Sequence, residues 1–414
     1  MRKLLFCGNG MSGEIIPALS KEYDIAVITE FIDDKGLESA SKVYQANSKV
    51  PQEALHAAKI IWNNGFKFEA VLSLCWDCPE SVSLIADYFN LAGLPIEIAR
   101  ISSDKYKRSQ KFFQNNIPSP KFYRVSSIKE LIQLRNRINY PIVLKPLNLS
   151  SSKGVVRVDS DEKLIESYYY TLSFYENVEK REIIVNEFIE GIEYSVEGLM
   201  INSKLFLTGI SERIFEYEKY YPNFVEVGDV IPAGLTNSQE KRVKKIVEDA
   251  ALALRINNGV VKADLIKSKT GKFYVLELTP RLGGPRFGTE MIPLSNGTNL
   301  LKAYIQQLLN EEIDKNLLTP KYNKGVVNRS LLLNEGIISK VTFNNLQNIE
   351  GFYDFKWWGI KPLKEGDVVT KPKFGCGSIG YIIACGGTRS EAIKNADKIE
   401  SSIKIEIVGE FNDE

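Results

Sequence analysis

The chain has 414 residues, of which 53 are Lys or Arg and 52 are Asp or Glu, so its formal net charge at pH 7 is +1. This length is too great for a single hydrophobic core, and two or three domains are expected. The balanced charge excludes a global field that would attract nucleic acid or an anionic membrane, and no apolar run approaches the roughly eighteen residues of a membrane span. We therefore expect a cytoplasmic globular protein.

The histidine and cysteine content narrows the chemistry further. His56 is the only histidine, so histidine acid/base catalysis and zinc held by histidines are nearly excluded. Five cysteines, an odd count, argue against a disulfide framework. Cys75 and Cys78 have C-x-x-C spacing, but no second pair at zinc-finger spacing accompanies them, so a redox or metal role is the weaker alternative. The chemistry must depend on carboxylates, Lys, Arg and backbone amides, with or without a metal.

The first hundred residues alternate between apolar strands and helices. A strand over 2–7 leads into the glycines of 8–13, which match G-x-G-x-x-G, and a helix over 14–20 and a strand over 24–29 follow. That pattern is typical of dinucleotide binding, yet it also makes a tight turn from strand to helix, which we favour because nothing downstream resembles hydride chemistry. Further alternation at 51–63, 70–74 and 79–89 predicts a doubly wound parallel sheet.

A second unit begins near residue 99 and offers two lysines and a small loop. A helix capped at 102–104 carries Lys105, and a strand ending near 145 carries Lys145. The loop that follows, 150–154, has the sequence SSSKG, whose free backbone N–H groups suit an anion. A flexible hairpin is the alternative for this loop, and a solvent-facing side chain is the alternative for Lys145.

The strand over 182–189 ends in a connector that could hold a purine. Its main chain could meet a purine edge, while Phe188 and Ile189 contact the faces of the ring. Glu193, just beyond the connector, could accept hydrogen bonds from ribose hydroxyls.

A predicted β-hairpin over 259–284 brings two carboxylates together. With Thr270 and Gly271 as the turn, Asp264 lies directly opposite Glu277. Like charges in that position are destabilising unless a cation lies between them, and Mg²⁺ prefers such oxygens together with substrate phosphates. Thr279 shares the face of Glu277, and Arg281 follows. The alternative is that nearby lysines such as Lys262 neutralise the acids.

Taken in order, these segments resemble the ATP-grasp superfamily, and among its members the carboxylate-amine ligases of the glycinamide ribonucleotide synthetase and L-amino-acid ligase types. The resemblance rests on the ordered set DK at 104–105, IVLKP at 142–146, SSSKG at 150–154, VNEFIEGIEYS at 185–195, and KAD at 262–264 with LELTPR at 276–281. It implies ATP and Mg²⁺, or Mn²⁺ in its place, as cofactors. It also implies the following contacts: Lys105, Lys145, Ser151, Ser152 and Gly154 with phosphates, Glu187, Phe188 and Ile189 with adenine, Glu193 with ribose, and Asp264, Glu277 and Thr279 with the metal.

The resemblance also implies a domain layout of the α/β class. We expect an N-terminal Rossmann-like domain over 1–98, an ATP-grasp domain over 99–310, and a small C-terminal α+β domain over 311–414 that packs on the grasp core. The family usually has Asn where this chain has Thr279, which makes that ligand less secure than the two acids.

The function implied is an ATP-dependent, ADP-forming carboxylate-amine ligase that works through an acyl phosphate. Arg281 would stabilise the transferring phosphoryl group, and Arg286 would hold a substrate carboxylate. A surface position is the alternative for Arg286. The alternative function is an ATP-grasp kinase for a small metabolite. The expected partners are a small carboxylate and an amine, with no nucleic acid and no membrane. The largest assembly that we expect is a homodimer.

Overall fold

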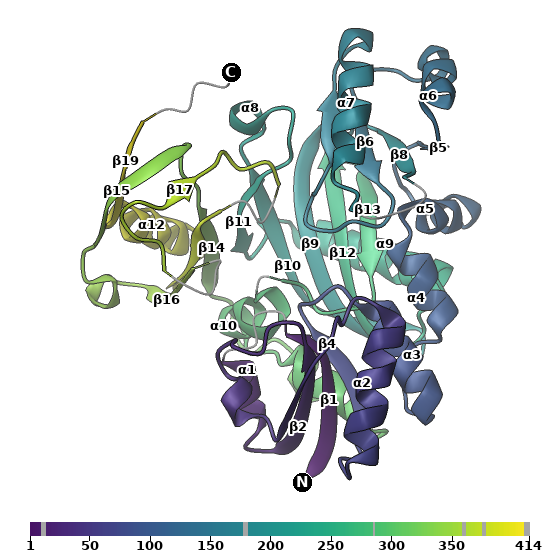
Figure 1. The fold of residues 1–414 in the computed structure, drawn as a ribbon, viewed down its shortest axis with the longest axis vertical. Helices are drawn as coiled ribbons and strands as arrows, with labels where there is room; N and C mark the ends of the chain where they lie inside the picture. The colour runs from purple at the N-terminus through teal and green to yellow at the C-terminus, as the bar shows by residue number, and fades with distance from the viewer. Residues whose placement is uncertain (10–13, 177–180, 285, 358–361, 375–377, 410–414) are drawn as a thin grey trace.

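The computed structural model describes residues 1–9, 14–176, 181–284, 286–357, 362–374 and 378–409. These residues form four β-sheets with helices packed around them, and the first strand, β1 (Arg2–Asn9), lies far from the last, β19 (Ile403–Val408) (Figure 1). Among the described helices, none is both long enough and apolar enough to cross a bilayer.

The N-terminal part is a four-stranded sheet with the order β3-β2-β1-β4, and every pairing in it is parallel. Leu4, Leu5, Phe6 and Cys7 of its central strand β1 are fully buried, because helices cover both faces of the sheet. This confirms the predicted doubly wound sheet, although residues 10–13 of the glycine segment lie outside the described residues. Its elements are β1 (Arg2–Asn9), α1 (Ile15–Leu19), β2 (Tyr23–Thr29), η1 (Leu37–Ser39), β3 (Lys42–Gln45), α2 (Pro51–Asn63), β4 (Ala70–Leu74) and α3 (Pro79–Phe89).

Two helices then lead to a small antiparallel sheet of order β5-β8-β6-β7. Asp104 caps the second helix by accepting hydrogen bonds from the N–H groups of Tyr106 and Lys107, at 2.9 and 3.0 Å, and so fixes where Lys105 begins that helix. The elements are α4 (Ile96–Ser103), α5 (Lys105–Gln114), β5 (Phe122–Val125), α6 (Ile128–Leu134), η2 (Arg135–Arg137), β6 (Ile142–Pro146), β7 (Val156–Val158), α7 (Asp161–Ser173) and β8 (Ile183–Glu187).

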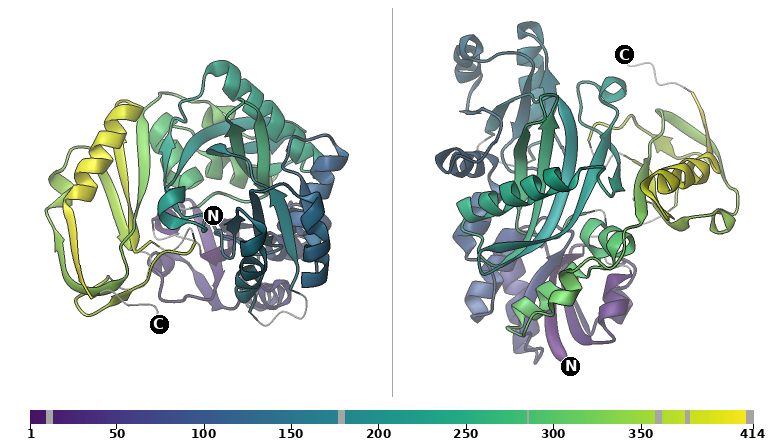
Figure 2. Two further views of the ribbon diagram at one scale, coloured as in Figure 1. Left: turned by 90° about the horizontal axis from the view of Figure 1, so that it is seen from above. Right: turned by 180° about the vertical axis from the view of Figure 1, so that it is seen from behind.

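The largest sheet has eight strands in the order β13-β12-β9-β10-β11-β14-β18-β16. One face is apolar and packs on α9, which crosses in front of the strands in the right-hand view of Figure 2. The other face carries polar residues at alternate positions, among them Glu193, Ser195 and Glu197. The elements are β9 (Gly191–Ile201), β10 (Lys204–Phe215), α8 (Tyr217–Tyr220), β11 (Glu226–Ile231), α9 (Asn237–Ala253), β12 (Gly259–Ser268), β13 (Phe273–Thr279), the π-helix η3 (Phe287–Met291), α10 (Ile292–Asn296), α11 (Leu300–Leu308) and η4 (Lys315–Leu318).

The C-terminal part joins the large sheet edge to edge. Strand β14 pairs with β11 from Val326 opposite Ile231 to Arg329 opposite Gly228, so the hydrogen-bond ladder continues from the central strands into the last hundred residues. A separate three-stranded sheet, β17-β15-β19, lies at the periphery. The elements are β14 (Gly325–Leu331), β15 (Gly336–Phe343), η5 (Leu346–Asn348), β16 (Phe352–Trp357), β17 (Val368–Val369), β18 (Gly380–Gly386), α12 (Arg389–Ser401) and β19 (Ile403–Val408).

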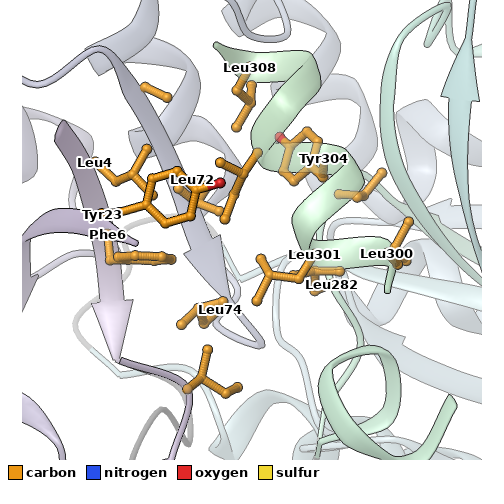
Figure 3. Close-up of a cluster of buried hydrophobic side chains, with 14 of the residues drawn as sticks. Leu4, Phe6, Tyr23, Leu72, Leu74, Leu282, Leu300, Leu301, Tyr304 and Leu308 are labelled. Atoms are coloured by element: carbon orange, nitrogen blue, oxygen red, sulfur yellow. The ribbon is translucent and has the colours of Figure 1, made fainter. Parts of the chain in front are cut away.

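A shared hydrophobic core fixes the N-terminal sheet against the rest of the chain. Leu4, Phe6 and Leu72 from β1 and β4 pack against Leu301 and Tyr304 of α11 (Figure 3). Burying large apolar side chains is worth about 1.5–3 kcal/mol each. The N-terminal sheet is therefore held at a set position relative to the central sheet.

Candidate active site

A pocket lies between the small sheet and the polar face of the large sheet. Its lining includes ten of the residues predicted from the sequence: Lys105, Lys145, Ser151, Ser152, Glu187, Phe188, Ile189, Glu193, Asp264 and Glu277. Gly154, Thr279, Arg281 and Arg286 do not line it. The structure thus brings together side chains from segments more than 150 residues apart in the sequence.

The hairpin of β12 and β13 places Asp264 directly opposite Glu277, as predicted. The route to that register differs from the prediction. Ser268 donates its N–H to the carbonyl of Lys272 at 2.9 Å, so the turn has three residues rather than two. A bulge at Leu276 restores the predicted alignment, because the register shifts by one residue between Asp264 and Leu265.

Cations neutralise the carboxylate of Asp264. Lys262 Nζ lies 2.6 and 2.5 Å from the two carboxylate oxygens, and Ser195 Oγ donates a hydrogen bond of 2.7 Å. Burial opposes the charge of Asp264, but Lys262 and Arg213 outweigh it and lower the pKa of that carboxyl group below its usual range. The lysine neutralisation considered from the sequence is therefore present, within a site that is also aligned for a metal.

Glu277 is charged as well. Arg108 Nη2 lies 3.3 Å from its Oε1. Burial raises the pKa of Glu277, but Arg108 and Lys105 outweigh that effect, so the pKa is lowered. Both acids therefore carry their charge at neutral pH.

The hairpin fits a hard divalent cation. Thr279 lies two residues after Glu277 on the same strand face, and its buried Oγ1 has no hydrogen-bond partner among the described residues. Among all the residues that the structure describes, no group of three or more His, Cys, Asp or Glu side chains lies close enough together to hold a metal ion. Two carboxylates and a hydroxyl leave the remaining ligands to water and phosphate, which is the usual arrangement for Mg²⁺.

Two lysines face these acids across the pocket. Burial lowers the pKa of Lys105 to about 8, although Glu277 opposes the shift, and burial also lowers the pKa of Lys145. Lys105 Nζ donates to the carbonyl of Leu149 and so contacts the chain just before the 150–154 loop. Both lysines are partly buried, which strengthens their attraction for an anion that enters.

Glu193 lies at the centre of a buried network. Tyr217 Oη donates to its Oε1 at 2.8 Å, and Arg213 Nη1 lies 3.3 Å from Oε2. Arg213 also pairs with Glu226 and lies 3.5 Å from Asp264 Oδ2. Burial raises the pKa of Glu193, and Arg213 offsets part of that rise. The network fixes Glu193 relative to the hairpin acids.

The end of β8 forms the apolar part of the pocket. Phe188 lies with its ring 4.5 Å from the guanidinium carbon of Arg157 and 6.4 Å from the ring of Phe224. The N–H of Glu187 donates to the carbonyl of Lys121 at 3.0 Å, and the N–H of Phe188 donates to the carbonyl of Pro141 at 3.3 Å. These contacts fix the connector that was predicted to meet a planar base.

The 150–154 loop has an unusual backbone. Ser151 and Ser152 both have φ of +58°, in the left-handed region, and Gly154 has φ of +68°. Such conformations cost an L-residue about 1–2 kcal/mol and occur mostly at functional sites. A Cβ on Gly154 would lie 2.9 Å from Pro146 Cγ, so glycine is required for packing there. Gly154 anchors the loop, while Ser151 and Ser152 face the pocket.

The two predicted catalytic arginines have different surroundings. Arg281 follows β13, and its Nε lies 3.1 Å from Asp77 Oδ1 of the N-terminal sheet. Arg286 is 3% exposed and forms ion pairs with Glu290 and with Asp354, the latter at 2.6 Å. A substrate carboxylate would have to displace one of these partners, so the role assigned to Arg286 stays a prediction that its contacts do not favour.

Three charged residues near the site were not predicted from the sequence: Arg108, Glu197 and Asp77. Arg108 is three residues after Lys105, and that spacing on one helix face was a usable signal. Glu197 is fully buried, burial raises its pKa to about 8, and it accepts the N–H of Gly283. Asp77 lies between Cys75 and Cys78, and the C-x-x-C spacing of these cysteines carries no signal for a carboxylate role.

Comparison with protein families adds independent information. The family described as "ATP-grasp domain" matches residues 138–289. An uncharacterized protein, y4rH, from Sinorhizobium fredii is 25% identical over 79% of this chain and 66% of its own length. A D-alanine–D-alanine ligase from Pseudomonas fluorescens is 27% identical over 47% of this chain and 59% of its own length. The chain thus spans less than two thirds, or 66% and 59%, of the length of these two curated relatives.

The fold also matches solved structures. The crystal structure of an L-amino acid ligase from Bacillus licheniformis superposes with a TM-score of 0.83 and covers 99% of each chain, at 19% sequence identity. At that identity the likeness establishes the fold. The predicted α/β class, with a parallel N-terminal sheet and an antiparallel central sheet, is confirmed.

Proposed function

We propose, from the premise that residues 138–289 of this chain form an ATP-grasp domain, that the protein is an ATP-dependent carboxylate-amine ligase. It would form an amide bond through an acyl phosphate and release ADP and phosphate. One observation carries the proposal: Lys105 and Lys145 face Asp264 and Glu277 across a single pocket. Phosphates bound between them would meet both cations and a metal-binding pair of acids.

Different pocket residues would contact different parts of the nucleotide. Phe188 and Ile189 would contact the adenine ring, the main chain beside Glu187 would meet its edge, and Glu193 would accept hydrogen bonds from the ribose. Lys105 and Lys145 would neutralise the phosphates, while Ser151 and Ser152 close over them.

The hairpin residues would serve the reacting phosphate. Mg²⁺, or Mn²⁺ in its place, would be held by Asp264, Glu277 and Thr279 and would neutralise phosphate charge. Arg281, just beyond the metal strand, would donate hydrogen bonds to the phosphoryl group during its transfer to the substrate carboxylate. When the amine attacks the acyl carbon, the same guanidinium would stabilise the oxyanion until phosphate leaves.

The partners we propose are a small carboxylate and a small amine, with a homodimer as the assembly. The cysteines Cys7, Cys75, Cys78 and Cys385 are free thiols. Free thiols and ATP chemistry both suit the cytoplasm, where we place the protein.

An isotope experiment tests the reaction class. With an ¹⁸O-labelled carboxylate, an amine and Mg·ATP, we expect one labelled oxygen in each released phosphate and the other in the amide. The label moves because the carboxylate oxygen that attacks the γ-phosphorus departs with it. Mass spectrometry of phosphate and product measures both, after candidate pairs are screened for ADP release.

The control for this experiment is the same mixture without the amine, which should release little phosphate. AMP and pyrophosphate as products would contradict the proposal. So would a phosphate left stably on the acceptor, which is the outcome of a kinase.

Nucleotide affinity should depend on the charge of Lys105. Its pKa is lowered to about 8 in the free protein, and bound phosphate favours the protonated form. Affinity is therefore fully present below pH 8 and is lost as the pH rises. We expect the Kd of a non-hydrolysable ATP analogue with Mg²⁺ to rise about tenfold between pH 7 and pH 9. Calorimetry at several pH values measures it.

The matched variant is Lys105→Arg, because the guanidinium stays charged throughout this range. Its Kd should be nearly constant between pH 7 and pH 9. An equal rise in both proteins would show that another group causes the pH dependence.

A further inference from the structure

The 75–78 loop, between β4 and α3, has no role in the proposed function, although its sequence CWDC stands out. Trp76 Nε1 donates to Ser48 Oγ at 2.9 Å, and Cys78 Sγ donates to the carbonyl of Cys7 at 3.2 Å. Burial raises the pKa of the Cys75 thiol to about 12. Cys78 thereby holds the loop to β1. Both thiols have a raised pKa and stay protonated, so a metal or redox role does not fit them.

The same loop also contacts the segment after β13. Asp77 Oδ1 lies 3.1 Å from Arg281 Nε, and Cys75 Sγ donates to the carbonyl of Gly283 at 3.0 Å. Arg281 Nη1 donates to the carbonyl of Leu282 at 3.0 Å. Two of the three guanidinium nitrogens are therefore fixed, and Nη2 makes no hydrogen bond within the described residues.

The ion pair between Asp77 and Arg281 can hold the orientation of the guanidinium group. Arg281 lowers the pKa of Asp77 despite the burial of that carboxyl group, so both partners are charged at neutral pH. Their side chains are only 17% and 32% exposed, and such shielding limits screening by salt. The loop that carries Asp77 is itself fixed by Trp76 and by both thiols.

We propose that Asp77 is a positioning residue that orients the Arg281 guanidinium toward the reacting phosphoryl group. The 75–78 loop of the N-terminal sheet would thereby contribute to a site whose pocket residues, from Lys105 to Glu277, all come later in the chain. The inference rests on the proposed function, because it takes the role of Arg281 from there.

Replacing Asp77 by asparagine tests this role. The amide keeps the size of the side chain but loses the charge that fixes Nε. We expect kcat for amide formation to fall about 10- to 100-fold, as for a small misplacement of a reacting group, while the KM for ATP changes less than about twofold. Asp77→Glu should recover part of the rate. Asp87→Asn, on the exposed surface of α3 with a backbone contact to Ile96, is the matched control and should behave as wild type.

A second substitution separates positioning from a merely structural role. In an Arg281→Lys background, Asp77→Asn should lower kcat by less than about threefold, because the partner it orients has been removed. If Asp77→Asn lowers kcat by the same factor in the wild-type and Arg281→Lys backgrounds, the inference is wrong. It is also wrong if Asp77→Asn alone leaves kcat unchanged. A fall in the melting temperature with unchanged kcat would equally contradict it.

The assay also distinguishes failure of the inference from failure of the proposed function. Wild-type protein that forms no amide with any carboxylate and amine overturns the proposed function, and the inference with it. Active wild type and Asp87→Asn beside an equally active Asp77→Asn overturn the inference alone.

Discussion

Replacing Glu277 by glutamine is expected to reduce ADP release at least about 1000-fold, because the neutral amide is a poor ligand for Mg²⁺. The amide oxygen can still accept a hydrogen bond from Arg108, which lies 3.3 Å from the carboxylate in the native protein. The fold should therefore survive the change. We also expect weaker binding of an Mg·ATP analogue. A coupled ADP assay, calorimetry and a thermal melt measure the three effects.

Glu190→Gln is the matched control for this prediction. Glu190 pairs with Lys269 at the surface, where both side chains are more than half exposed, and such a pair is worth about 0–1 kcal/mol at most. This variant should keep full activity. Normal turnover in Glu277→Gln would show that the hairpin acids do not hold a metal.

Arg281→Ala is expected to lower kcat about 100- to 1000-fold, or about 3–4 kcal/mol of transition-state stabilisation. Arg281 does not line the pocket that we propose for ATP, so the KM for ATP should change little. An effect on kcat without an effect on binding is typical of a contact that strengthens in the transition state. Steady-state kinetics with saturating carboxylate and amine separate the two parameters.

Arg100→Ala controls for the loss of a charged side chain. Arg100 is about half exposed and pairs with Glu97 on the surface of α4. It should leave kcat unaltered. If Arg281→Ala instead raises the KM for ATP at constant kcat, the arginine binds ground-state phosphate and has no special role in transfer.

The sequence predicted the register of the β12–β13 hairpin because its signal is local. Alternation along two adjacent strands is sufficient to put Asp264 and Glu277 on one face. The predicted register was right although the turn was wrong, since the three-residue turn and the bulge at Leu276 compensate for each other. A turn and a bulge each depend on backbone energies that a residue pattern does not specify uniquely.

The surroundings of the two arginines could not be predicted in this way. Asp77 and Arg281 are 204 residues apart, and Arg286 and Asp354 are 68 apart. Their meeting depends on how separate sheets pack, and no short-range periodicity encodes that arrangement. The same limit explains why Arg286, a plausible carboxylate ligand in the sequence, is enclosed by two acids in the structure.

The ladder between β11 and β14 affects how the chain can be divided. A chain cut after residue 310 would lose β14 and leave the edge of β11 with unpaired N–H and C=O groups over Gly228 to Ile231. Open edges of that kind recruit strands from other molecules. The last hundred residues therefore cannot be removed without exposing an edge of the large sheet. An engineered fragment or chimera would need a replacement strand in the same register to keep the edge of β11 from pairing with other molecules.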